Sequence, residues 1–96
     1  MLFVIVAKDK PNSLALRSAS RQAHLEYAKT TGVVRLAGPL LNEKDEMIGS
    51  LLIIESASLD AAKAWQSNDP YVKAGLFQSA ELHPWKAAVN LCNAAL

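Results

Sequence analysis

Two apolar runs constrain the fold of this chain more than any other feature of its sequence. Residues 2–7 are apolar at six consecutive positions, and residues 51–54 at four. Short apolar runs that contain Val or Ile and end at charged or turn-forming residues are typical of buried strands. Successive side chains of a strand point to opposite faces, so each of these strands is apolar on both faces. Helices cover one face of a sheet, and the other face therefore also needs a cover.

The segments around these runs show helical and extended patterns in turn. Residues 14–31 contain no Gly or Pro, follow the possible cap residues Asn12 and Ser13, and precede Gly32, which predicts a helix. Ser58 is expected to cap a second helix that ends near residue 69, because Pro70 disfavours helical dihedral angles in the residue before it. The other expected elements are a strand over 33–37 ended by a turn at 38–39, a hairpin tip at 42–46, a strand over 47–54, a helical turn at 71–74 and a strand over 77–85.

The expected order of elements is βαββαβ, the split arrangement of ferredoxin-like folds. We therefore expect one α+β domain over residues 1–96, with a four-stranded antiparallel sheet that carries both helices on one face. Leu59, Ala62 and Trp65 repeat at helical spacing and are expected to face the sheet. An open apolar sheet face exceeds what soluble monomers tolerate, so we expect a homodimer in which two such faces pack together. The Ala- and Asn-rich tail, residues 86–96, is expected to be helical and is too short to cover a whole sheet.

Charge and cysteine content argue against several classes of partner. The formal net charge is +1 and the basic residues are scattered, whereas phosphate backbones and anionic membranes bind concentrated basic surfaces. The first apolar run is too short to span a bilayer and has no basic segment before it. The single cysteine, Cys92, forms no internal disulfide, so nothing in the sequence requires an oxidising compartment. We expect a cytoplasmic protein with no nucleic-acid and no membrane partner.

The candidate site rests on a histidine and an aspartate. Motifs for nucleotides, for a nucleophile elbow or for zinc are missing from the sequence, so we expect no cofactor and no metal. His24 shares a helical stripe with Arg17 and Arg21, and nearby cations disfavour a protonated imidazole unless a carboxylate balances them. Asp69 is a candidate for that carboxylate, because a His–carboxylate pair fixes the tautomer and raises the basicity of the imidazole.

Spacing alone leaves a second interpretation open for each candidate residue. A single histidine on a helix is also typical of a surface position, and an aspartate before Pro70 is also typical of a helix-end cap. Ser50 either faces a cleft or bonds to the backbone. Tyr71 either lines the same turn as Asp69 or covers the helix end. The other histidine, His83, is interpreted as structural or solvated.

Several short motifs occur in order along the chain: Arg21-Gln22-Ala23-His24-Leu25-Glu26-Tyr27, Gly38-Pro39-Leu40, Gly49-Ser50, Asp69-Pro70-Tyr71, Gly75-Leu76 and Pro84-Trp85. Together they resemble the YCII-related (YciI-like) family, within the dimeric α/β-barrel superfamily, over nearly the whole chain except the tail. The resemblance implies a ferredoxin-like subunit, a dimer formed by two packed sheets, and a cleft between the helices and the sheet.

The resemblance also implies a site and a class of activity. It places the family's active pair on His24 and Asp69, with Ser50 near them, and a related member removes chloride from a chlorinated hydroxyquinol. We therefore expect a cofactor-independent enzyme of the lyase, isomerase or dehydrochlorinase type that acts on a small cyclic or aromatic metabolite. In this hypothesis His24 is the acid or base and Asp69 orients it, while Ser50, Arg21 and Tyr71 contact the substrate. The alternative is a non-catalytic dimer module that binds a small molecule or a protein.

Overall fold

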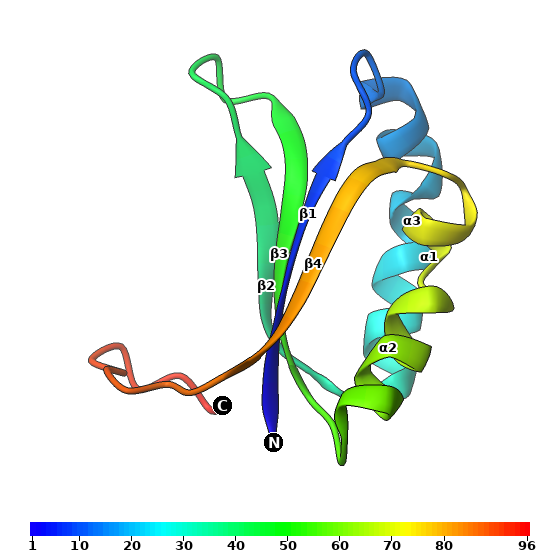
Figure 1. The fold of residues 1–96 in the computed structure, drawn as a ribbon. Coiled ribbons are helices and arrows are strands. Elements are labelled where there is room, and N and C mark those ends of the chain that lie inside the picture. The colour runs from blue at the N-terminus through cyan, green and yellow to red at the C-terminus, as the bar shows by residue number, and fades with distance from the viewer.

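The chain folds as one antiparallel sheet with its helices packed on a single face (Figure 1). The computed structural model describes residues 1–96. Its elements are β1 (Leu2–Asp9), α1 (Leu14–Thr31), β2 (Val34–Leu41), β3 (Met47–Glu55), α2 (Leu59–Ser67), α3 (Pro70–Lys73) and β4 (Phe77–Trp85). The four strands lie in the order β2-β3-β1-β4. This arrangement is the ferredoxin-like fold, so the expected fold class is confirmed. None of the helices combines the length and the hydropathy needed to cross a bilayer.

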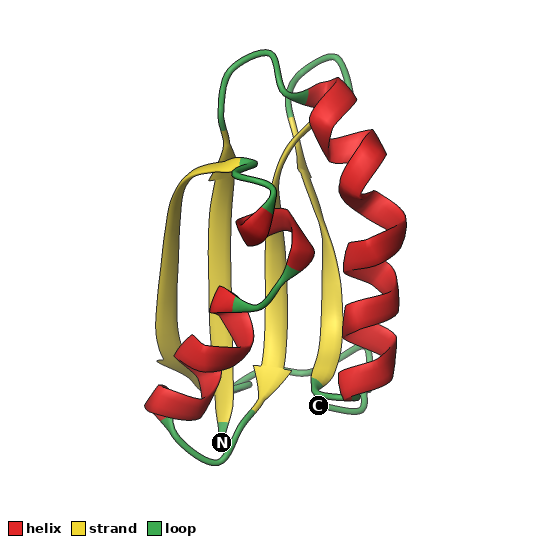
Figure 2. Ribbon diagram, turned by 90° about the vertical axis from the view of Figure 1, so that its right-hand side faces the viewer, coloured by secondary structure: helices red, strands yellow, loops and turns green.

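The helix-covered face of the sheet holds the core. Antiparallel pairing sets Phe3 and Ile5 of β1 opposite Ile54 and Leu52 of β3, and residues paired in this way point to the same face. The core cluster is Phe3, Ile5, Leu52, Ile54, Ala62 and Trp65. Figure 2 views the molecule from the helical side, with α1 lying beside α2 and α3 across the strands. Leu59, expected to face the sheet, is instead 38% exposed at the start of α2.

The opposite face of the sheet is apolar as well. Val4, Ile53 and Leu36 form a row across β1, β3 and β2, and in β1 and β3 the row alternates with core positions. Leu36 is 51% exposed. All helices lie on the other side of the sheet, while the tail after β4 runs out on this side (Figure 1). The chain therefore presents apolar side chains on both faces of the sheet, as its sequence predicts.

The ends of the helices follow the expected signals with one exception. α1 ends at Gly32, which adopts the left-handed conformation (φ 69°) that favours glycine. The Ser58 hydroxyl accepts a hydrogen bond from the Ala61 N–H at 3.1 Å and caps α2. Ser13 occupies the N-cap position of α1, but its hydroxyl donates to the Pro11 carbonyl and caps no helical N–H.

Two predictions of local structure are wrong. The expected turn at Gly38 and Pro39 is part of β2, and Pro39 is tolerated there because β2 is an edge strand. The expected helix in the tail is missing, and residues 86–96 are irregular, with a turn at residues 91–92. The Asn90 side chain bonds to both the N–H and the C=O of Ala94, which competes with helical hydrogen bonding, and Asn93 has a positive φ of 56°.

Candidate active site

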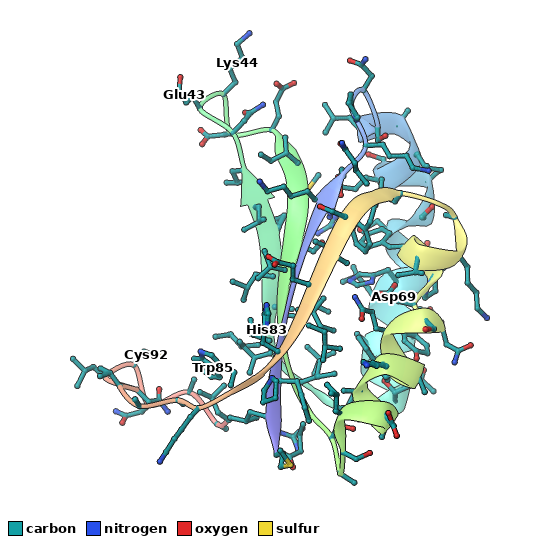
Figure 3. All side chains as sticks on the ribbon, viewed as in Figure 1. Glu43, Lys44, Asp69, His83, Trp85 and Cys92 are labelled. Atoms are coloured by element: carbon teal, nitrogen blue, oxygen red, sulfur yellow. The ribbon has the colours of Figure 1, made fainter.

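His24 of α1 and Asp69, just before α3, form a buried pair between these helices. His24 Nδ1 lies 2.8 Å from Asp69 Oδ1, although 45 positions separate the two residues along the chain. Their side chains are 9% and 4% exposed, and Asp69 lies on the helical side of the sheet (Figure 3). A carboxylate only accepts hydrogen bonds, so Nδ1 carries a proton, and in the neutral imidazole Nε2 has the lone pair. This geometry suits an imidazole that takes up or delivers a proton at Nε2.

The local sequence holds Asp69 in place. Pro70 favours an extended backbone in the residue before it, and Asp69 adopts φ −62° and ψ 127° as the N-cap of α3. Its Oδ1 also accepts a hydrogen bond from the Tyr71 N–H at 2.9 Å. The two interpretations that the sequence left open, a helix cap and a partner of His24, are thus fulfilled by the same carboxylate.

Tyr71 fixes the plane of the imidazole. Its ring stacks on the ring of His24, with centroids 4.0 Å apart and planes inclined by 13°. Burial raises the pKa of the Tyr71 phenol, and the charges of Arg17 and Arg21 oppose this shift without reversing it. Tyr71 is therefore a neutral wall of the site near neutral pH.

A second buried ion pair lies next to the first. Arg17 Nε and Nη2 donate to the two carboxylate oxygens of Asp9 at 2.7 and 3.0 Å, and Nη2 also donates to Ser50 Oγ at 2.8 Å. The Arg17 guanidinium carbon lies 4.8 Å from the centroid of the Tyr71 ring, which links the two pairs. Burial lowers the pKa of Arg17, but hydrogen bonding to Asp9 and its charge outweigh burial, so the pKa is raised. The guanidinium stays charged.

These groups border a hollow of about 170 Å³ between α1 and the β2–β3 half of the sheet. Six of its twelve lining residues are hydrophobic, and its polar lining includes Arg17, Arg21, His24, Ser50 and Tyr71. A cavity of about 150 Å³ accommodates one benzene ring. The hollow therefore suits a ligand with a single six-membered ring.

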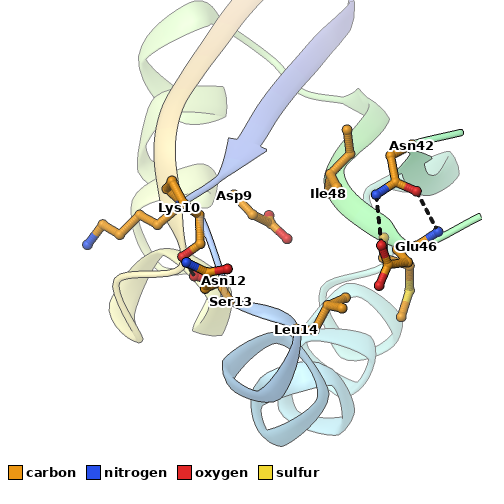
Figure 4. A pocket seen from close by; sticks show the side chains of 10 residues that line it. Asp9, Lys10, Asn12, Ser13, Leu14, Asn42, Glu46 and Ile48 are labelled. Atoms are coloured by element: carbon orange, nitrogen blue, oxygen red, sulfur yellow. Dashed lines mark hydrogen bonds between the residues drawn. The ribbon is translucent and has the colours of Figure 1, made fainter. Parts of the chain in front are cut away.

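A larger hollow, of about 300 Å³, lies between the β1–α1 turn and the β2–β3 hairpin (Figure 4). Its acidic groups are already engaged, because Asp9 pairs with Arg17 and Glu46 accepts a hydrogen bond from the Asn42 amide. It contains no histidine. Its side chains offer no acid–base pair, so the smaller hollow is the candidate active site. No group of three or more His, Cys, Asp and Glu side chains is arranged to hold a metal ion.

The five residues that the sequence and the resemblance pointed to surround one pocket. Arg21, His24, Ser50 and Tyr71 line it, and Asp69 lies behind His24. Arg21 is exposed and hydrogen-bonds to none of the other four. The other histidine, His83, is exposed on β4, away from the pocket, and its Nε2 lies 3.9 Å from a carboxylate oxygen of Glu81.

Sequence reasoning missed Asp9 and did not assign a role to Arg17. The charged residues 8–10 indicated a turn after the first strand, whereas β1 extends to Asp9. The sequence does contain a signal for Asp9. Phe3, Ile5, Ala7 and Asp9 occupy every second position of the strand, so their side chains point to the same face, the one that the helices cover. Arg17 lies seven residues before His24, on the same stripe of α1.

Comparison with known proteins places the chain among relatives of similar length. The YCII-related domain family matches residues 1–86. Protein YciI of Escherichia coli is 39% identical over 95 residues, covering 90% of this chain and 97% of the relative. An uncharacterized protein of Haemophilus influenzae is 37% identical with the same coverage.

Solved structures give a similar result. The 5-chloro-2-hydroxyhydroquinone dehydrochlorinase of Burkholderia phenoliruptrix, in complex with 2,5-dihydroxybenzoquinone, is 38% identical with a TM-score of 0.81, covering 90% of this chain and 94% of that one. An antibiotic biosynthesis monooxygenase, 14% identical with a TM-score of 0.56 and 90% and 99% coverage, shares the fold alone. The family match and the relatives cover most of the chain, and the protein belongs to the YCII-related family.

Proposed function

We propose that the protein is a cofactor-independent enzyme that performs acid–base chemistry on a hydroxylated metabolite with a single ring. The observation that carries the proposal is the His24–Asp69 pair, 2.8 Å apart, with His24 lining a hollow of about 170 Å³. Support comes from the similar dehydrochlorinase, whose structure holds the single-ring ligand 2,5-dihydroxybenzoquinone.

In the proposed reaction, His24 Nε2 takes a proton from a ring hydroxyl while Asp69 stabilises the imidazolium that forms. The electron pair left on the oxygen moves into the ring. In an isomerisation, the imidazolium returns the proton to a ring carbon. In an elimination, the imidazolium returns the proton to the ring carbon that carries the halide. Nε2 then takes the proton of a second hydroxyl, whose electron pair moves into the ring while the halide leaves with the electron pair of its bond to carbon. The product is a quinone, and the imidazolium releases the second proton to water. Ser50 or Arg21 contacts the developing oxyanion, and Tyr71 contacts the ring.

Replacement of His24 tests the proposal, with the other histidine as the matched control. The assay follows chloride release from 5-chloro-2-hydroxyhydroquinone and conversion of a panel of hydroxylated single-ring compounds. We expect His24→Gln to lower kcat/KM by about 10²–10⁴-fold, the usual effect of removing a general acid or base. His83→Gln is expected to keep wild-type activity, because His83 is exposed and distant from the pocket.

Two outcomes would contradict the enzyme proposal. One is turnover that His24→Gln leaves unchanged. The other is that none of the compounds is converted while some raise the Tm of the protein, since a ligand that binds only the folded state stabilises it. The second outcome would instead favour the non-catalytic binding module.

We also propose that the protein is a homodimer in which the open sheet faces of two copies pack together. The support is the apolar row of Val4, Ile53 and Leu36 on the face that no helix covers. Soluble monomers rarely expose contiguous apolar patches larger than several hundred Å². On β4 this face is polar, since His83 and Glu81 lie beside Val4 and Val6. With strands about 4.8 Å apart and a rise of about 3.3 Å per residue, the three other strands span roughly 400 Å².

A further inference from the structure

Arg17 is a buried charged group of the pocket that the acid–base step leaves unused. Its side chain is 3% exposed and is held by three hydrogen bonds, two to Asp9 and one to Ser50. A guanidinium has five N–H donors, and these three bonds engage only Nε and Nη2. A hydrogen bond with Tyr71, which also lines the pocket, further raises the pKa of Arg17.

Arg17 borders the pocket. No fully buried polar side-chain atom of the protein lacks a hydrogen-bond partner. Arg17 lines the smaller hollow and not the larger one. The part of Arg17 that is not covered by the protein therefore meets solvent or a ligand in this hollow.

Ser50 adds a second donor beside Arg17. Its oxygen accepts a hydrogen bond from Arg17 Nη2 at 2.8 Å, which orients the hydroxyl but does not use its proton. Ser50 is 4% exposed and lines the same hollow. Two donors from α1 and β3, one of them charged, thus lie next to each other at one wall of the pocket.

We infer that Arg17 and Ser50 form a fixed subsite for an ionised oxygen of the ligand, and that Asp9 is the positioning residue of this subsite. The ligand class that fits is a single-ring phenolate or enolate anion, with its charged oxygen at Arg17 and its reacting edge toward His24. The inference rests on the proposed function for the reacting edge, but the anion subsite is tested by binding alone.

The arrangement of charges favours this role for Arg17 over Arg21. The Asp9 carboxylate balances the charge of the buried Arg17 guanidinium, since a lone buried cation is costly. The carboxylate bonds only to the edge of the guanidinium formed by Nε and Nη2. Because the Arg17 side chain is already held in place, ligand binding does not have to immobilise it, and no affinity is lost in that way. Arg21 is exposed, so water and salt screen its charge.

Two probes and a double variant test the subsite. The anionic probe is 2,5-dihydroxybenzoquinone, whose vinylogous acid groups are ionised at neutral pH, and the neutral probe is hydroquinone, whose hydroxyls keep their protons as tyrosine does. Arg17→Gln alone would leave the buried Asp9 carboxylate without a partner. The main variant is therefore Asp9→Asn with Arg17→Gln, which removes both charges together. Arg35→Gln is the matched control, because Arg35 is exposed and bonds only to the Gly32 carbonyl.

Isothermal titration calorimetry measures both affinities. We expect the wild type to bind the anionic probe. The double variant should bind it at least about tenfold more weakly, because charge-assisted hydrogen bonds are lost. Hydroquinone affinity is expected to stay within about twofold, and Arg35→Gln to leave both affinities unchanged. Equal loss for both probes, no loss for either, or no binding of the anionic probe to the wild type would overturn the inference.

The two proposals fail separately. Charge-selective binding that depends on Arg17, in a protein that converts none of the compounds, would leave the subsite standing and remove the enzyme proposal. Turnover that depends on His24, with binding of the anionic probe that does not depend on Arg17, would do the opposite.

Discussion

Asp69 shows how one residue positions another across the fold. Pro70 imposes an extended backbone, that backbone makes Asp69 a helix cap, and the capping oxygen is the same atom that meets His24. The sequence predicts the first two steps, because they depend on neighbouring residues. The meeting with His24 depends on how α1 packs against α3, which residue spacing does not encode, so the family resemblance was needed to single out the pair.

Buried pairs were the hardest part of the site to predict from sequence. Asp9 lies among charged residues that indicate a turn, and strand alternation points it to the helix-covered face without naming its partner, Arg17. A buried carboxylate requires a partner, and sequence alone does not reveal that partner when it comes from another element.

The tyrosines give a prediction for alkaline pH. Burial raises the pKa of both, Tyr27 and Tyr71, and the charge of Asp69 adds to the shift of Tyr27. A raised pKa in the folded state means that the unfolded chain loses these protons first. The resulting stability is fully present below about pH 10 and is lost as the pH rises through the folded-state pKa values.

Ultraviolet difference absorbance of phenolate measures this directly. We expect the folded protein to form phenolate at higher pH than the same chain in urea, and Tyr71→Phe to remove one of the two delayed steps. Coincident titration of the folded and unfolded chains would contradict the raised pKa values.

At the scale of elements, local signals predict where helices begin and end but not which side chain makes the cap. Ser13 and Ser58 both precede helices, yet only the Ser58 hydroxyl bonds to a helical N–H. The strand β2 was predicted too short because Gly38 and Pro39 indicate a turn, and their tolerance in a strand follows from its edge position, a property of the whole sheet.

The two serines therefore differ in their expected effect on stability. Ser58→Ala should lower the free energy of unfolding by about 1 kcal/mol, the usual cost of losing a side-chain cap. Ser13→Ala, the matched control, should change it by less than about 0.5 kcal/mol. Urea unfolding followed by circular dichroism measures both, and equal effects would show that the observed cap is not what stabilises α2.

At the scale of the whole molecule, the sheet with two apolar faces is the feature that the sequence predicted most directly. The runs at 2–7 and 51–54 become most of β1 and part of β3, the two central strands, and the helices cover only one of their faces. The tail was predicted less well, because alanine-rich composition favours a helix while the Asn90 side chain stabilises turns.

The proposed dimer predicts a clear effect of charge on the open face. Leu36→Asp should convert the dimer to a monomer, because a carboxylate buried between two apolar sheets has no partner. Leu16→Asp is the control, since Leu16 is a partly exposed leucine on α1, within the helical layer. Sedimentation velocity at micromolar concentration measures both, and a monomeric wild type or a dimeric Leu36→Asp variant would argue against the interface.

The central claim, that Asp69 fixes His24 so that Nε2 acts on a ligand in the pocket, is tested most directly by long-range ¹H–¹⁵N NMR of the two imidazoles. We predict that His24 carries a proton on Nδ1, because the Asp69 carboxylate 2.8 Å away only accepts hydrogen bonds. Adding 2,5-dihydroxybenzoquinone should shift the Nε2 signal of His24 and leave His83 unchanged. An unprotonated Nδ1 of His24, or a His24 signal that the ligand does not move, would contradict the account.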